Sequence, residues 1–125
     1  MKHDKNLSPV GWYVVSYLLR FVELNDDRKD DDEARFLSWE NTILVRARNL
    51  DDAYEKGMTV ARENVKPYTG GPDGVPVQWE LVGITDVLPI YEKLRDGAEI
   101  LWTERAPRKL KNLKQMVGPK GSFRQ

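Results

Sequence analysis

The sequence contains no cysteine and only one histidine, His3, which stands in the polar N-terminal segment. The absence of cysteine excludes a disulfide framework, a cysteine-ligated zinc site and thiol catalysis. A serine–histidine–aspartate arrangement would need His3 as an oriented base, and a chain terminus is a poor place for one. We therefore expect no metal site and no cofactor, and only an all-carboxylate cation site stays open.

Long hydrophobic runs are also missing. The most apolar stretch, residues 12–24, is interrupted by Ser16, Arg20 and Glu23. It falls short of the ~20 apolar residues that a membrane-spanning helix needs. The N-terminal segment has no apolar core followed by small residues, so it does not look like a secretory signal. We expect a cytoplasmic protein that makes no membrane contact.

Negative charge is missing from the C-terminal end. The 125 residues carry a formal net charge of zero, but acidic side chains gather in 26–33, and every charged side chain in 105–125 is positive. The length fits one domain, and partner arguments start from this segregation of charge. The candidate contacts for an anionic partner are the cations Arg105, Arg108, Lys109, Lys111, Lys114, Lys120 and Arg124.

Two stretches are typical of neighbouring β-strands. Residues 12–24 are rich in β-branched and aromatic side chains, and both alternating faces are largely apolar, which is typical of a central strand. A buried helix is the competing interpretation. Residues 36–47 also alternate, and the segment 25–35 between the two stretches predicts a solvated acidic loop. The two strands are therefore expected to pair antiparallel.

A helix is predicted from Asn49 or Asp51 to about residue 65. Asn49 followed by Asp52 is close to a capping box, and the segment 66–67 ends the helix because the residue before a proline disfavours helical backbone angles. Small apolar residues fall on one helical face, which lets a helix lie close to a sheet. The residues on this face are Ala53, Gly57, Val60, Ala61 and Val65.

The rest of the domain predicts a turn over 68–76 and two further strands, over 77–85 and 98–103. Gly83 indicates either a bulge or a close backbone approach. Asp86 is placed to cap a short helix over 87–95, with Pro89 in its first turn and Gly97 at its end.

We therefore predict an α+β fold: a four-stranded, mainly antiparallel sheet in the order β-β-α-β-short α-β, with one main helix packed on it. The domain is expected to span 12–104 and to contain the acidic loop 25–35, and residues 1–11 are expected to form a flexible N-terminus. Residues 105–125 form what we call the basic extension. Apolar side chains recur in it at helical spacing, at Leu110, Leu113, Met116 and Val117.

Short motifs follow one another along the domain: Trp12-Tyr13, Ile43-Leu44-Val45-Arg46-Ala47, Asp51-Asp52-Ala53-Tyr54, Val77-Gln78-Trp79, Val82-Gly83-Ile84-Thr85-Asp86-Val87 and Asp96-Gly97-Ala98-Glu99. In these motifs the segment 12–104 resembles a small bacterial family catalogued as domain of unknown function 4288. The resemblance supports the predicted strand order and implies no activity, cofactor or catalytic residue. The acidic loop and the basic extension look like additions to the family pattern.

The four tryptophans stand one each in the four predicted strands, at Trp12, Trp39, Trp79 and Trp102. Because a buried tryptophan removes a large area from water, this distribution predicts a heavily aromatic core. A strand with two apolar faces can bury one against the helix and the other against a second subunit, where tyrosine and tryptophan are enriched. The candidate self-association residues are Tyr13, Tyr17, Trp39 and Trp102, and a purely internal role is the alternative.

No chemical motif points to catalysis. The glycine-rich segment 70–74 lacks the lysine of a phosphate-binding loop and precedes a strand, so a plain turn is favoured. The acidic loop lacks the spacing and central glycine of a calcium-binding loop. Carboxylates on or beside the predicted strands could pair as acid and base only if the fold brings them together. They are Glu80, Asp86, Glu99 and Glu104.

The leading functional hypothesis is a non-enzymatic protein-interaction module that forms a homodimer. One alternative is binding of nucleic acid or of an acidic protein through the basic extension, against the simpler reading of a solvated segment or one that folds onto an acidic loop. The other alternative is a small-ligand or enzymatic domain with a pocket between helix and sheet. A deep pocket in which Arg46 or Arg48 converges with Glu80 would favour it, and a solid core would count against it.

Overall fold

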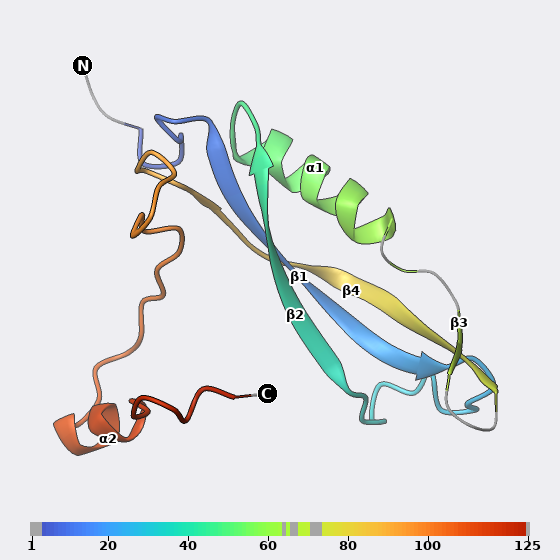
Figure 1. The fold of residues 1–125 in the computed structure, drawn as a ribbon. Helices are drawn as coiled ribbons and strands as arrows, with labels where there is room; N and C mark the ends of the chain where they lie inside the picture. The colour runs from blue at the N-terminus through green and yellow to red at the C-terminus, as the bar shows by residue number, and fades with distance from the viewer. Residues whose placement is uncertain (1–3, 64, 66–67, 71–73, 125) are drawn as a thin grey trace.

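The computed structural model describes residues 4–63, 65, 68–70 and 74–124. The elements run β1 (Trp12–Glu23), β2 (Ser38–Arg46), α1 (Leu50–Glu63), β3 (Tyr68–Gly70), β4 (Val75–Pro89) and α2 (Leu110–Gln115) (Figure 1). Their strands form one sheet in the order β2-β1-β4-β3, in which every pairing is antiparallel. The α+β class and the antiparallel sheet are therefore confirmed. The sheet has three long strands rather than the four predicted, and its fourth member, β3, is three residues long.

Strand β1 lies at the centre of the sheet. It pairs with β2 through residues 12–20 and with β4 through residues 13–23, so both of its edges are hydrogen-bonded. Its odd-numbered side chains, such as Tyr13 and Val15, point towards α1, and the opposite face carries Val14 and Val22, which are also buried. The prediction of a central strand is confirmed, and the competing interpretation of 12–24 as a buried helix is wrong.

The core lies between α1 and the sheet. Ala53 packs with Tyr13, Val15 and Val45, and one further cluster joins Ala61 to Tyr17 and Leu19. At Gly57 the helix approaches the sheet so closely that an added Cβ would lie 2.4 Å from Val15 Cγ1. The small helical face predicted from the sequence is therefore the surface that packs on β1.

Tryptophan does not build this core. All four tryptophans are half-buried or exposed, and the aromatic side chains of the buried core are Tyr13 and Tyr17. For Trp39 and Trp79, which lie on the α1 face, the reason is the difference in length between the two layers. A helix of 14 residues covers roughly 21 Å, whereas a strand of 12 residues runs for roughly 40 Å. Half-buried Trp79 packs at the edge of the Ala61 cluster, where it meets Phe21 edge to face and Trp39 at a tilt, with ring centroids 5.4 and 4.7 Å apart. Trp12 instead lies on the other face of β1, and Trp102 follows the last strand.

The predicted short helix over 87–95 is wrong: residues 87–89 belong to β4, and residues 90–95 form neither helix nor strand. Val87 and Leu88 pair with Val15 and Val14 of β1, and the strand continues to Pro89. The N–H of Ile90 donates a hydrogen bond to the carbonyl of Trp12 at 2.9 Å. Pairing with the central strand therefore overrides the local capping signals at Asp86 and Pro89.

The predicted strand over 98–103 is also wrong, because this segment has no strand pairing. A turn precedes it, in which Gly97 has a φ of +84° and Glu92 Oε2 accepts a hydrogen bond from the N–H of Glu99 at 2.8 Å. The additional strand is instead β3, which pairs with the start of β4 inside the region expected to be a turn. The predicted turn residues 71–73, the predicted helix end at 66–67 and His3 lie outside the described residues.

The segment before β1 is tied to the domain through Ser8. The Ser8 side chain is buried and donates to the carbonyl of Ile90 at 2.6 Å, while its Oγ accepts from the N–H groups of Val10 and Trp12 at 3.2 Å. The N–H of Ser8 donates to the Tyr13 hydroxyl at 3.0 Å. Part of the segment expected to be a flexible N-terminus therefore has several fixed hydrogen-bond partners.

Helix α2 stands apart from the sheet. Within the described part of the chain it contacts no strand and does not contact α1, and the chain leading to it extends away from the end of β4 (Figure 1). Neither described helix is long and apolar enough to cross a membrane. The molecule thus consists of a two-layer domain and an extended C-terminal segment that ends beyond α2.

Candidate interaction surface

One face of the sheet is covered by α1, and no described helix covers the other (Figure 1). Strand pairing places Leu44 and Leu88 beside Val14 on this second face, and Leu18 opposite Gly83. Leu44 is 47% exposed, and Val82, at the bulge next to Gly83, is 59% exposed. We call this surface the open face and define it by Leu18, Leu44, Val82, Gly83 and Leu88.

A bulge shapes the centre of the open face. The pairing of β1 with β4 shifts register between Leu18 and Leu19, which leaves Val82 without a direct partner on β1. Gly83 lies opposite Leu18, and a Cβ added to Gly83 would meet no atom within 4 Å. The bulge predicted at Gly83 is confirmed, whereas the alternative of a close backbone approach is wrong. The glycine leaves Leu18 uncovered on that side.

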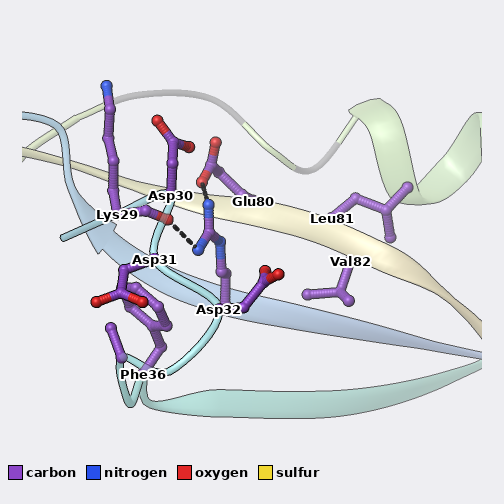
Figure 2. Close-up of a pocket in the computed structure, with 10 residues that line it drawn as sticks. Lys29, Asp30, Asp31, Asp32, Phe36, Glu80, Leu81 and Val82 are labelled. Carbon is purple, nitrogen blue, oxygen red and sulfur yellow. Dashed lines mark hydrogen bonds and ion pairs between the residues drawn. The ribbon is translucent and has the colours of Figure 1, made fainter.

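An open pocket of about 470 Å³ adjoins the open face where the acidic loop returns to the sheet (Figure 2). Arg20 connects the loop to the sheet: its guanidinium donates to the carbonyl of Lys29 at 2.6 Å and to Glu80 Oε1 at 2.9 Å. The same guanidinium lies over the Phe36 ring, 4.7 Å from its centroid. In Figure 2, the side chains of Leu81 and Val82 leave β4 on opposite sides, and both residues line the pocket.

The pocket is acidic. Four carboxylates line it, from Asp30, Asp31, Asp32 and Glu80, against the two cations Arg20 and Lys29, which leaves two negative charges in excess. Arg20 is already paired with Glu80, and within the described part of the chain neither Asp30 nor Asp32 forms an ion pair. The negative charge of this pocket is therefore free to meet an external cation.

Side-chain hydrogen bonds hold the loop in tight turns. Asp26 Oδ1 accepts from the N–H of Arg28 at 2.8 Å, and Asp31 Oδ1 accepts from the N–H of Glu33 at 2.9 Å. The first of these bonds, together with the Arg28 guanidinium, lowers the pKa of Asp26 below its ordinary value. Over the described residues no three acidic or histidine side chains are placed to hold a metal ion.

The structure separates the four residues that the sequence nominated for self-association. Tyr13 and Tyr17 lie in the core beneath α1, inside the protomer. Trp39 and Trp102 are 55% and 53% exposed. Trp39 pairs with Leu19, whereas Trp102 lines a small pocket beside Pro89, the partner of Tyr13. The two exposed tryptophans therefore lie towards opposite ends of β1.

The seven cations of the basic extension are all exposed. Within the described residues none of them pairs with a carboxylate: Arg108 contacts the Met116 sulfur at 3.7 Å, and Arg124 donates to the carbonyl of Gly121. Four apolar side chains in and after α2 are exposed as well: Leu110, Leu113, Met116 and Val117. The extension thus presents both unpaired positive charge and uncovered apolar area.

The residues whose convergence would favour a pocket for catalysis or a small ligand lie apart. Arg46 stacks on Trp12 at 4.8 Å and Arg48 lies 3.7 Å from Asp52, whereas Glu80 is bound to Arg20. Because Arg46 pairs with Trp12 and Glu80 pairs with Arg20, Arg46 and Glu80 are most of a strand length apart. The arrangement that would favour this alternative is therefore not found among the described residues.

Sequence reasoning expected a second apolar face on the central strand but missed the acidic pocket beside it. The available signal was Arg20, the single cation of the central strand. Its partner Glu80 is 60 positions away, and strand register was needed to bring the two together.

These elements define an α+β domain in which one helix covers one face of an antiparallel sheet. The model of the family described as Domain of unknown function (DUF4288) matches residues 12–102, and the chain belongs to this family. No curated protein and no solved structure matches the chain. The family match includes the three long strands and α1, and it stops before α2.

Proposed function

We propose that this protein is a non-enzymatic interaction module that forms a homodimer through its open face. The observation that carries the proposal is the exposure of Leu44 and Val82 beside half-buried Leu18 and Leu88 on a sheet face without a helical layer. A sheet buries apolar area by packing each face against another layer, so this face is suited to a protein partner.

The charge around the open face favours a selective partner. Arg20, Glu80 and the aspartates of the acidic loop form a polar rim at one end, next to exposed Val82. The apolar side chains of this face lie in two rows, through Val14 and through Leu18, and the polar row of Thr42, Ser16 and Asp86 separates them. Apolar rows with a charged rim fit a protein interface, in which the rim sets orientation and the apolar side chains supply most of the affinity. As part of the same proposal, the module acts in the bacterial cytoplasm, a reducing compartment that suits a sequence without cysteine.

A charge introduced on the open face tests this proposal. We expect the wild-type chain to sediment as a dimer at tens of micromolar, and Leu44→Arg to sediment as a monomer because a buried guanidinium would lose its hydration without a partner. The matched control is Tyr54→Arg, on the outer side of α1, where the wild-type side chain is 42% exposed. The control should remain dimeric.

The outcome is decisive if both variants retain the wild-type melting temperature. A wild-type chain that is strictly monomeric, or a Leu44→Arg variant that stays dimeric, would remove the open face as a self-association surface.

A second candidate function is supported by the unpaired cations of the basic extension. We propose it as binding of an anionic partner, either an acidic protein or nucleic acid, through Arg105, Lys109, Lys111 and their neighbours. Such binding should weaken steeply as salt rises and should disappear from a chain that ends at Glu104. Retention of the partner by the shortened chain would contradict it.

A further inference from the structure

We propose that the basic extension of one copy docks on the open face of a second copy, with α2 over Val82 and its lysines directed at the acidic pocket. This inference rests on the proposed function and names the segment that occupies the open face. The contact is reciprocal, so that two copies exchange their basic extensions around a two-fold axis.

First, α2 has an apolar side that is exposed. Leu110 and Val117 are 65% and 76% exposed, and Leu113 and Met116 are exposed with them. Positions 110, 113 and 117 repeat at helical spacing and gather on one side. A six-residue helix has little stability of its own in water. It gains stability when this apolar side is buried, and the open face offers exposed Leu44 and Val82 as the counterpart.

Second, the basic extension and the acidic pocket carry opposite charges. The described part of the basic extension carries only cations, and none of them is paired with a carboxylate. The pocket at the end of the open face has two negative charges in excess, and among the described residues Asp30 and Asp32 form no ion pair. Because both charges lie on the same chain, every copy supplies the cationic and the anionic half of the contact. Opposite charges around the apolar centre then fix the orientation of the docked helix.

Third, the chain carries α2 away from the sheet of its own domain. α2 makes no contact with the described strands of its own domain, and the segment before it runs outward from the end of β4 (Figure 1). Residues 103–109, between the pocket that Trp102 lines beside Pro89 and the start of α2, reach at most roughly 25 Å when fully extended. This reach lets α2 contact a molecule that lies against its own copy.

The lack of native cysteine allows a direct test. Two single-cysteine variants, Val82→Cys and Leu113→Cys, are mixed at tens of micromolar and treated with a short thiol-specific crosslinker. We expect a crosslinked pair of peptides containing positions 82 and 113, identified by mass spectrometry. The matched control replaces Val82→Cys with Tyr54→Cys, which places an exposed thiol on α1, and should give no more than background product.

Salt and truncation complete the test. We expect the yield of the 82–113 product to fall at least several-fold between 50 and 500 mM salt, on the order of the loss expected when exposed charges are screened. We also expect a chain ending at Glu104 to be monomeric. The melting temperature of the shortened chain monitors its fold, because α2 contacts no other described element.

Each alternative occupant gives a different result. A shortened chain that stays dimeric while Leu44→Arg is monomeric overturns the docking of the extension and leaves the proposed function intact. A wild-type monomer overturns both. A double variant, Val82→Cys with Leu113→Cys, that crosslinks only within one chain shows docking in cis and overturns exchange. A monomer that carries nucleic acid, lost on truncation at Glu104, assigns the extension to nucleic acid and overturns it as well.

Discussion

At the scale of single residues, Gly57 and Arg20 shape the two faces of the sheet. Gly57 lets α1 approach the sheet, because only a residue without a Cβ fits against Val15. On the other face, Arg20 connects the acidic loop to the end of the sheet through hydrogen bonds to Lys29 and Glu80. One residue provides close packing and the other provides a charged rim.

Gly57→Ala should destabilise the protein, although alanine favours helix by about 1 kcal/mol over glycine. The added methyl group would lie 2.4 Å from Val15 Cγ1, which forces the helix or the valine to move. Overpacking of this kind typically costs ~1–3 kcal/mol, so a net loss of about 1 kcal/mol in the free energy of unfolding is expected from urea denaturation.

A double-mutant cycle checks the cause. Val15→Ala alone should destabilise by leaving a cavity, but combined with Gly57→Ala it makes room for the new methyl group. The pair should therefore be more stable than the sum of the two single effects. Additive effects would show that the approach of helix and sheet at this point does not limit stability.

At the scale of elements, α1 depends on its N-terminal cap. Asn49 Oδ1 accepts from the N–H of Asp52 at 2.8 Å, and Asp52 Oδ2 accepts from the N–H of Arg48 at 3.0 Å. The Asn49 half of the expected capping box is therefore present, whereas Asp52 accepts from the N–H of Arg48 rather than from that of Asn49. Asn49→Ala should lower the free energy of unfolding by about 1 kcal/mol, the usual effect of losing a cap.

The charge of Asp52 gives the cap a pH dependence. The N–H of Arg48 lowers the pKa of Asp52 below 3.8, helped by the charges of Lys56 and Arg48. Between the lowered pKa and 3.8 the unfolded chain binds more protons than the folded one, so this contribution is present above 3.8 and is lost as pH falls through the lowered value. Asp52→Asn should therefore be less stable than wild type at pH 7, and the difference should shrink towards pH 2.

Urea denaturation of both proteins at a series of pH values measures this difference. An identical gap at pH 7 and at pH 2 would show that the charge of Asp52 plays no part in the cap.

Elements that are specified by neighbouring residues in the sequence were predicted correctly, whereas elements that depend on pairing with a distant strand were not. β1, β2 and α1 were correct because their own periodicity and caps specify them. The segment 87–95 was assigned to a helix from Asp86 and Pro89, yet Val87 and Leu88 are held in a strand by pairing with β1. The tryptophans were assigned to the core from residue type alone, and the short reach of α1 could not be seen until the layers were assembled. The acidic pocket was missed for the same reason.

At the scale of the whole molecule, charge and apolar area are divided between two parts of the chain. The domain carries an acidic pocket beside a sheet face that no described helix covers, and the basic extension carries cations beside exposed apolar side chains. Within one copy these surfaces do not meet, since α2 contacts no other described element. We propose that they meet across two copies. The acidic loop of one copy and the basic extension of the other then bring opposite charges together.

The separation of α2 also predicts an independent domain. A chain that ends at Glu104 should retain the melting temperature of a monomeric full-length chain, because α2 contacts neither α1 nor any described strand. The Leu44→Arg variant supplies that monomeric reference, and thermal denaturation followed by circular dichroism makes the comparison. A fall of more than a few degrees on truncation would mean that the extension stabilises its own domain.

The most direct test of the account is sedimentation equilibrium of the full chain and of the chain ending at Glu104, each measured across a concentration series at low and high salt. The account predicts a dimer for the full chain that weakens as salt rises, and a monomer for the shortened chain under every condition. A full chain that is monomeric at all concentrations, or a shortened chain that dimerises as strongly as the full one, would contradict it.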